Sequence, residues 1–201
     1  MRLELAKTKF LKIFAILAAL TLLTGCGINN IPTLEEEAKA QWGQVLNQYQ
    51  RRADLIPNLV ATVKGYAEHE QETLTQVIEA RAKATQMTIP KDILSNPAAF
   101  SQFQANQGSL GAALGKLMVV VERYPDLKAD TNFLTLQAQL EGTENRISVA
   151  RRDYIIAVKN FNTEIKTFPG RIWHSFMYSD TEYMQQFEVA KAVENVPKVT
   201  F

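Results

Sequence analysis

The chain has 201 residues, of which 46% are apolar and 21% are charged, and this length is enough to bury the core of one domain. Its 22 basic and 21 acidic residues nearly balance, and four of the basic but only one of the acidic residues fall in the first 25 positions. The rest of the chain has no excess of positive charge for binding nucleic acid or an anionic surface, so we expect no nucleic-acid partner.

The first 25 residues have the parts of a secretory signal. Arg2 and three lysines precede an apolar run at residues 13–23 (IFAILAALTLL), and small residues follow it. The run has about half of the roughly 20 residues that a membrane-spanning helix needs. We therefore predict a signal peptide at residues 1–25 that is cleaved rather than retained as a helix.

Leu23, Thr24, Gly25 and Cys26 resemble the lipobox of bacterial lipoproteins. This resemblance implies cleavage before Cys26 and a diacylglycerol joined to its sulfur, with acyl chains such as palmitate. One acyl chain anchors only marginally, whereas two or three hold a domain at a bilayer. The alternative is an ordinary signal peptide with a chance cysteine, but lipidation also accounts for the presence of a single cysteine in the chain.

The residue after the lipidated cysteine indicates which membrane would hold the lipoprotein. By analogy with enteric lipoproteins, Gly27 in place of aspartate points to the outer membrane, on its periplasmic face, in an organism with two membranes.

A long helical pattern follows a tether at residues 26–32. We predict one helix over residues 33–87, capped by Thr33 and roughly 80 Å long. Its seam residues follow one another at alternating gaps of four and three: Val45, Tyr49, Arg52, Ile56, Leu59, Val63 and Tyr66. Pro57 frees the carbonyl of Ala53, and since the spacing continues past it, we expect a kink and no break.

Two short helices are predicted next. A connector at residues 88–96 leads to an N-cap at Asn96, which a proline follows. The first short helix covers residues 97–106 and is ended by Gly108, and the second covers residues 110–124 and is ended by a proline. The second has apolar residues at gaps of four and three: Leu110, Leu114, Leu117 and Val121.

A second long helix is predicted over residues 130–168, where Pro169 and Gly170 end it. Its seam comprises Phe133, Leu140, Ile147, Tyr154, Val158, Phe161, Ile165 and Phe168. A further helical turn is expected at residues 171–178, and then an irregular tail whose extended end contains Val196, Pro197 and Val199. The pattern predicts an all-α, elongated, antiparallel four-helix-bundle-like domain with two long and two short helices.

Residue types suited to metal or nucleophilic chemistry are sparse. His69 and His174 lack the partner residues of a zinc HExxH motif and of a di-iron bundle site. The sequence has no phosphate-binding glycine loop and no GxSxG serine motif. We therefore expect no metal, no cofactor and no enzymatic activity.

Charges on the two long seams are more informative. An antiparallel register pairs Glu70 with Arg151 and Arg81 with Glu144, and it also places Asn162 and Phe161 near Pro57 and Asn58. Such pairs favour a structural role, because a slipped register would leave buried charge unpaired. The alternative interpretation is a polar ligand site inside the bundle.

Several motifs resemble the LemA family closely. They are QRRADLIPNLV at residues 50–60, VKGYA at 63–67, His69-Glu70, RYPDLK at 123–128, TENRI at 143–147, Phe161-Asn162, Phe168-Pro169 and PKVTF at 197–201. Arg51, Arg52, Asp54, Pro57 and Asn58 form the central motif. The chain departs from the family at Ile155, where asparagine is usual, and at Tyr183-Met184, where an aromatic pair is common.

The resemblance covers residues 33–201 and implies a helical bundle outside the cytoplasm, with no established reaction. Together with the lipobox, it predicts a lipid-anchored, non-catalytic protein of the cell envelope that contacts an unidentified envelope protein. The alternative is a ligand-binding bundle or an unrecognised envelope hydrolase that uses the polar seam. The sequence assigns no oligomeric state.

Overall fold

The computed structural model describes residues 27–188, which are almost entirely helical apart from the connections. The main helices are α2 (Asn30–Tyr66), α3 (Gln71–Thr85), α4 (Pro97–Val121) and α6 (Thr131–Glu164). Shorter helical pieces are η1 (Glu68–Glu70), α5 (Pro125–Lys128) and α7 (Gly170–Met177). The all-α bundle is confirmed, with α2 and α6 as its two long helices.

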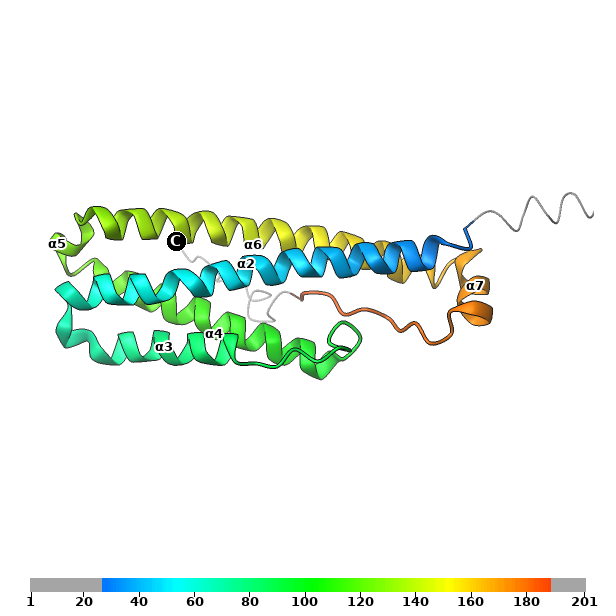
Figure 1. The fold of residues 1–201 in the computed structure, drawn as a ribbon, viewed down its shortest axis with the longest axis horizontal. Helices are drawn as coiled ribbons and strands as arrows, with labels where there is room; N and C mark the ends of the chain where they lie inside the picture. Colours follow the sequence, from blue (N-terminus) through cyan, green and yellow to red (C-terminus); the bar gives the residue numbers. More distant parts are fainter. Residues whose placement is uncertain (1–26, 189–201) are drawn as a thin grey trace, which may run out of the picture.

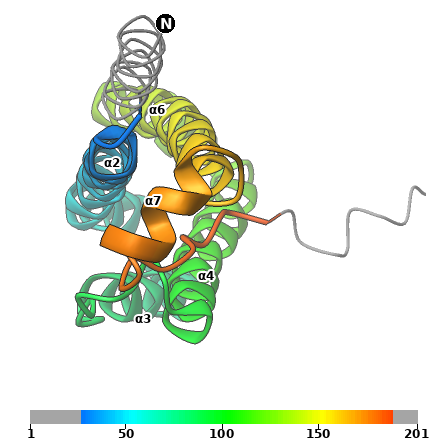
Figure 2. The same cartoon turned by 90° about the vertical axis from the view of Figure 1, so that its right-hand side faces the viewer.

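The main helices run alternately up and down in an elongated bundle (Figure 1). α2 and α6 lie side by side, and α3 packs against both α4 and α2. α5 joins α4 to α6 at one end of the bundle, while α7 and the start of α2 lie at the other (Figures 1 and 2). Residue 27 and α7 therefore share one end of the molecule.

The apolar interior is divided into two clusters along the bundle axis. The cluster nearer α7 is rich in rings and includes Trp42, Tyr49, Phe100, Phe103, Tyr154, Phe161 and Phe187. The cluster nearer α5 is mostly aliphatic and includes Ile56, Leu59, Val63, Leu110, Leu117, Phe133 and Leu140. The predicted seams supply most of the buried residues in the cluster nearer α5 but fewer than half of those in the cluster nearer α7, and Tyr66 and Phe168 are exposed.

The first long helix begins earlier than the sequence predicts. α2 starts at Asn30, so Thr33 is not its N-cap; the Thr33 hydroxyl instead donates to the carbonyl of Asn29 at 2.7 Å. The helix continues through Pro57 without a break, as expected.

A single helix over residues 33–87 is wrong, because the chain reverses after Tyr66. Ala67 leaves the helical conformation (φ −131°, ψ 55°), η1 completes the turn, and α3 folds back onto α2. The helical spacing continued across this turn because α3 also buries one face, through Leu74, Val77 and Ala80. Periodicity alone therefore does not reveal the reversal.

The two short helices predicted after residue 96 are one helix, α4. Its start is as predicted: the Asn96 side chain accepts a hydrogen bond from the Ala99 N–H at 3.1 Å, and Pro97 takes the first position. Gly108 does not end it but lies on its exposed face. The extra reversal at Ala67 compensates for the one missing here, so α2 and α6 remain antiparallel.

α6 is capped by Asp130, whose carboxylate accepts from the Phe133 N–H at 2.8 Å, but it ends at Glu164 rather than Phe168. α7 confirms the short helix expected after Gly170. The predicted signal peptide, Cys26 and the extended end at Val196, Pro197 and Val199 lie outside the described residues.

Asn162 fastens the segment after α7 to α6. Its amide donates to the carbonyl of Met184 at 2.9 Å and accepts from the N–H of Met184 at 3.0 Å. The hydroxyl of Tyr154 donates to the carbonyl of Gln185 at 2.8 Å. Asn162 therefore does not lie beside Pro57 as the sequence register suggested.

Replacing Asn162 by Ala should release this segment. Both hydrogen bonds to Met184 are lost, so we expect faster hydrogen exchange at the Met184 amide and a loss of about 1–2 kcal/mol in the free energy of unfolding. Asn160→Ala is the control, because Asn160 is exposed on the same helix. Equal exchange rates in the two variants would show that Asn162 does not fasten the segment.

Candidate functional site

A polar layer separates the two apolar clusters. It contains the three buried polar residues of the described chain, Arg52 from α2, Gln107 from α4 and Thr143 from α6. Arg52 faces inward because it lies three residues after Tyr49 and four before Ile56 on the seam of α2. The layer therefore lies where three helices meet.

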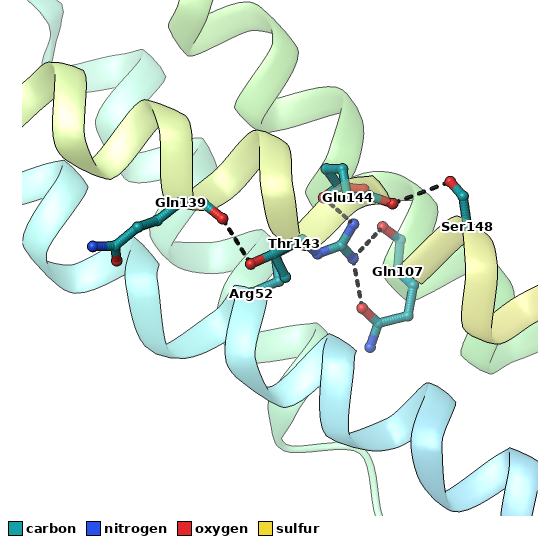
Figure 3. A network of polar contacts seen from close by, with 6 residues as sticks. All are labelled: Arg52, Gln107, Gln139, Thr143, Glu144 and Ser148. Atoms are coloured by element: carbon teal, nitrogen blue, oxygen red, sulfur yellow. Dashed lines mark hydrogen bonds and ion pairs between the residues drawn. The ribbon is translucent and has the colours of Figure 1, made fainter. Parts of the chain in front are cut away.

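The Arg52 guanidinium joins these helices (Figure 3). Its Nη1 donates to Glu144 Oε1 at 3.0 Å, and its Nη2 donates to Gln107 Oε1 at 2.7 Å and to the Gln107 carbonyl at 3.1 Å. The same group lies 5.0 Å from the centre of the Tyr49 ring, a cation–π distance. Arg52 Nε is buried with no hydrogen-bond partner among the described residues.

The ion pair is asymmetric, since 4% of the Arg52 side chain but 45% of the Glu144 side chain is exposed. Glu144 lines a groove of about 620 Å³ between α4 and α6, together with Leu114, Met118 and Leu140. Gly111 also lines it, and a Cβ there would lie only 4.0 Å from Arg52 Nη1. The layer thus has one solvent-facing carboxylate at the edge of a groove.

Two further groups flank the layer on the side of the aromatic cluster. Burial raises the pKa of Tyr49, and the nearby charges of Arg151 and Arg52 partly oppose this rise. The Arg151 guanidinium lies 4.3 Å from the centre of the Phe187 ring. Arg151 is therefore used to hold the segment after α7, not to neutralise a carboxylate on α2 or α3.

A second polar cluster ties the chain reversal to the start of α6. Glu70 accepts from Arg123 at 2.9 Å and from the Tyr124 hydroxyl at 3.0 Å. The Tyr66 hydroxyl donates to Asp130 at 3.0 Å. The hydrogen bonds from the Phe133 N–H and then from Tyr66 lower the pKa of Asp130.

The predicted pairs Glu70–Arg151 and Arg81–Glu144 do not form. They assumed that Glu70 and Arg81 extend the helix that faces α6, whereas these residues lie in η1 and α3, beyond the chain reversal. Arg52 takes the place that the sequence register gave to Arg81.

Arg81 has a different role, linked to Pro57. Its Nε donates to the carbonyl of Ala53 at 2.8 Å. This carbonyl is the acceptor that Pro57 leaves without its usual backbone donor. The returning helix α3 thus supplies the missing hydrogen bond.

The remaining motif residues face solvent. Arg51 and Asn58 are exposed, and exposed Asp54 accepts from Gln50 of its own helix at 2.7 Å. Sequence reasoning missed Gln107, although it lies at helical spacing between Phe103 and Leu110. It also missed Thr143, whose hydroxyl donates to the carbonyl of Gln139 at 2.7 Å (Figure 3).

What the layer does chemically follows from its contacts. The buried cation is held by a carboxylate and two amide oxygens, an arrangement that joins helices rather than activating a nucleophile. Residues 27–188 contain no cluster of three potential metal-binding His, Cys, Asp or Glu side chains. None of the helices in this range is long and apolar enough to cross a membrane.

Breaking the central ion pair should destabilise the bundle. We expect Arg52→Met and Glu144→Ala each to lower the free energy of unfolding by about 2–3 kcal/mol, below the value for fully buried pairs because Glu144 is partly solvated. A double-mutant cycle in urea should give a coupling of about 1–2 kcal/mol. The control Arg51→Met should change stability by less than about 0.5 kcal/mol. Strictly additive effects would contradict the pairing.

Removing the proline should make Arg81 dispensable. In the natural chain, Arg81→Met leaves the Ala53 carbonyl without a donor and should cost about 1–3 kcal/mol. Adding Pro57→Ala provides a backbone N–H at position 57, so the same arginine substitution should then cost less. Lys83→Met, on the exposed face of α3, is the control. If Arg81→Met lowers the free energy of unfolding equally with proline or alanine at position 57, then Arg81 does not compensate for Pro57.

Comparison with known proteins identifies the family of this chain. A sequence model of the LemA family matches residues 41–201. The chain is 26% identical to Magnetosome protein MamQ 2 of Paramagnetospirillum magneticum over 176 residues, which cover 79% of this chain and 64% of that protein. It is 30% identical to Protein LemA of Metamycoplasma hominis over 119 residues, 59% of this chain and 49% of that protein. The chain thus spans less than two thirds of the length of these relatives. Because the family model covers most of the sequence, including the motifs that resembled it, the chain belongs to the LemA family.

Proposed function

We propose that this protein is a lipid-anchored, non-catalytic component of the cell envelope that acts as an interaction or scaffolding module. The observation that carries the proposal is the short distance in sequence between the lipobox and the bundle. Three residues separate Cys26 from α2, which begins at Asn30. A lipid on Cys26 would therefore hold a rigid helical rod close to the membrane surface, without a long linker.

The polar groups of the interior support a non-catalytic role. The charges of Arg52, Arg81 and Glu70 are all engaged by partners on other segments of the fold. A general acid, base or nucleophile instead needs a group that reaches substrate and changes its protonation or bonding. Neither the family description nor the names of the relatives above state a reaction.

The relatives bear on the cellular setting only by their names. One is called a magnetosome protein and the other a LemA protein. Our placement of the present chain in the envelope rests on its own sequence, because the lipobox that ends at Cys26 predicts a lipid anchor. In an organism with two membranes, we place it on the periplasmic face of the outer membrane, because the residue after Cys26 is glycine and, by analogy with enteric lipoproteins, the absence of aspartate there points to that membrane.

A ligand-binding bundle is the second candidate, and the groove between α4 and α6 favours it. Glu144 is half-exposed at that groove, and Arg52 Nε lies unpartnered nearby. Cross-linking in native membranes followed by mass spectrometry separates the two candidates. Cross-links from the outer faces of α3 or α6 to an envelope protein support scaffolding, whereas a small molecule that co-purifies only when Glu144 is intact supports the groove.

The anchor can be tested directly. Cys26→Ser removes the sulfur that would carry the diacylglycerol, so the variant should take up no labelled palmitate and should leave the membrane fraction. Thr24→Ser is a matched control within the lipobox and should still be labelled. Continued labelling and membrane association of Cys26→Ser would overturn the lipoprotein assignment.

A further inference from the structure

Large apolar side chains gather, exposed, at one end of the bundle. Phe168 is 79% exposed, Phe176 83%, Met177 55% and Ile172 42%. All four belong to α7 or to the turn that precedes it. Exposed apolar residues that cluster in this way mark a surface that contacts another apolar phase.

The position of α7 is fixed by contacts on its other side. Trp173 packs against the aromatic core cluster, and His174 Nε2 lies 2.8 Å from the carbonyl of Thr181. Ile172 and Phe176 are four residues apart in α7, so they project from one side of the helix, and exposed Phe168 lies in the turn just before it. The helix is therefore rooted on one side and open on the other.

The open side lies where the chain would leave a membrane anchor. A Cβ on Gly27 would lie 3.6 Å from Pro169 Cγ, and Asn30 Nδ2 donates to Glu164 Oε1 at 3.2 Å. The start of α2 and the turn into α7 are thus neighbours, and Figures 1 and 2 show both at the same end of the bundle. Gly27 directly follows Cys26, the residue proposed to carry the lipid.

The charges around this surface favour an apolar partner over an anionic one. Lys166 and Arg171 are exposed before and on α7, whereas Asp180 and Glu182 after it, and Glu36 and Glu37 at the start of α2, are exposed acids. Because positive charge is not in excess at this end, electrostatic attraction to anionic headgroups would contribute little. Aromatic and aliphatic side chains on a short amphipathic helix are instead typical of insertion into the interfacial layer of a bilayer.

We propose that α7 and the preceding turn insert Phe168, Ile172 and Phe176 into the interfacial layer of the membrane leaflet that holds the lipid on Cys26. This inference rests on the proposed lipid anchor. An acyl group alone leaves a domain free to tilt, whereas a second contact beside it fixes the orientation. The bundle then stands with the α7 end at the membrane and the α5 end away from it.

Fluorescence quenching by labelled lipids tests this contact in the full-length, processed protein. Phe176→Cys is labelled with the environment-sensitive probe NBD, and the protein is placed in phosphatidylcholine vesicles whose acyl chains carry a shallow nitroxide quencher. Val119→Cys is the matched control, because Val119 is 70% exposed two residues before the end of α4, which leads into α5. A lipidated Cys26 has no free thiol and takes no probe, and the unsubstituted protein gives the background.

We expect the quencher to lower the emission from position 176 at least about twofold and to leave that from position 119 unchanged, since nitroxide quenching requires near contact with the acyl chains. High salt should not reverse the effect, because little of the attraction is electrostatic. Equal quenching at the two positions would overturn the insertion. A second result would also overturn it: a probe at position 176 that is shielded from solvent in native membranes but is not quenched in vesicles that contain no other protein. A partner protein, and not lipid, would then cover α7.

Palmitate labelling of the same preparation separates this inference from the anchor. Acylated protein without quenching at position 176 overturns the insertion and leaves the anchor standing. Protein that is quenched without acylation overturns the anchor and supports the insertion. Protein with neither property overturns both.

Discussion

Arg52 carries a full positive charge into the centre of the bundle, where only 4% of its side chain is exposed. Removing such an ion from water costs several kcal/mol unless partners replace the lost hydration. Glu144 supplies one partner from α6 and Gln107 supplies two from α4. The charge is therefore compensated only when α2, α4 and α6 are assembled in one register. Arg52 thereby links α4 to α6, between which a groove lies.

The second link between distant segments has the same logic. Pro57 leaves the Ala53 carbonyl without its helical donor, and Arg81 on α3 replaces that donor. Taken alone, a buried cation and a proline in a helix interior would both destabilise α2. Glu144 and Gln107 compensate the cation, and Arg81 compensates the proline, and these residues reach α2 only in the folded bundle. The motif at residues 50–60 thus specifies how the helices meet as well as which face of α2 is buried.

Helical spacing predicted the buried faces of α2, α4 and α6, the Asn96 cap and the all-α fold. It did not predict what those faces pack against. No proline or aspartate marks the reversal at Ala67, and α3 keeps the same spacing, so one helix was expected and its register with α6 came out wrong. Gly108 was interpreted as a stop, but it lies inside α4 on the solvent face, where the packing of the opposite face outweighs the cost of about 1 kcal/mol that glycine imposes on a helix. Arg52 was recognised on the seam, yet its partners depended on that register.

The polar layer and the proposed anchor together would constrain where a partner can bind. With α7 at the bilayer, the 37 residues of α2 extend the bundle by about 55 Å from the membrane. The distant end holds α5 and the hydrogen-bonded cluster of Glu70, Arg123 and Tyr124. The central ion pair and the Arg81 link join α2 to α3, α4 and α6, so they would couple this end to the α7 end. Under the proposed anchor, a partner that binds there would be held at a fixed height above the bilayer, as the proposed scaffolding role requires.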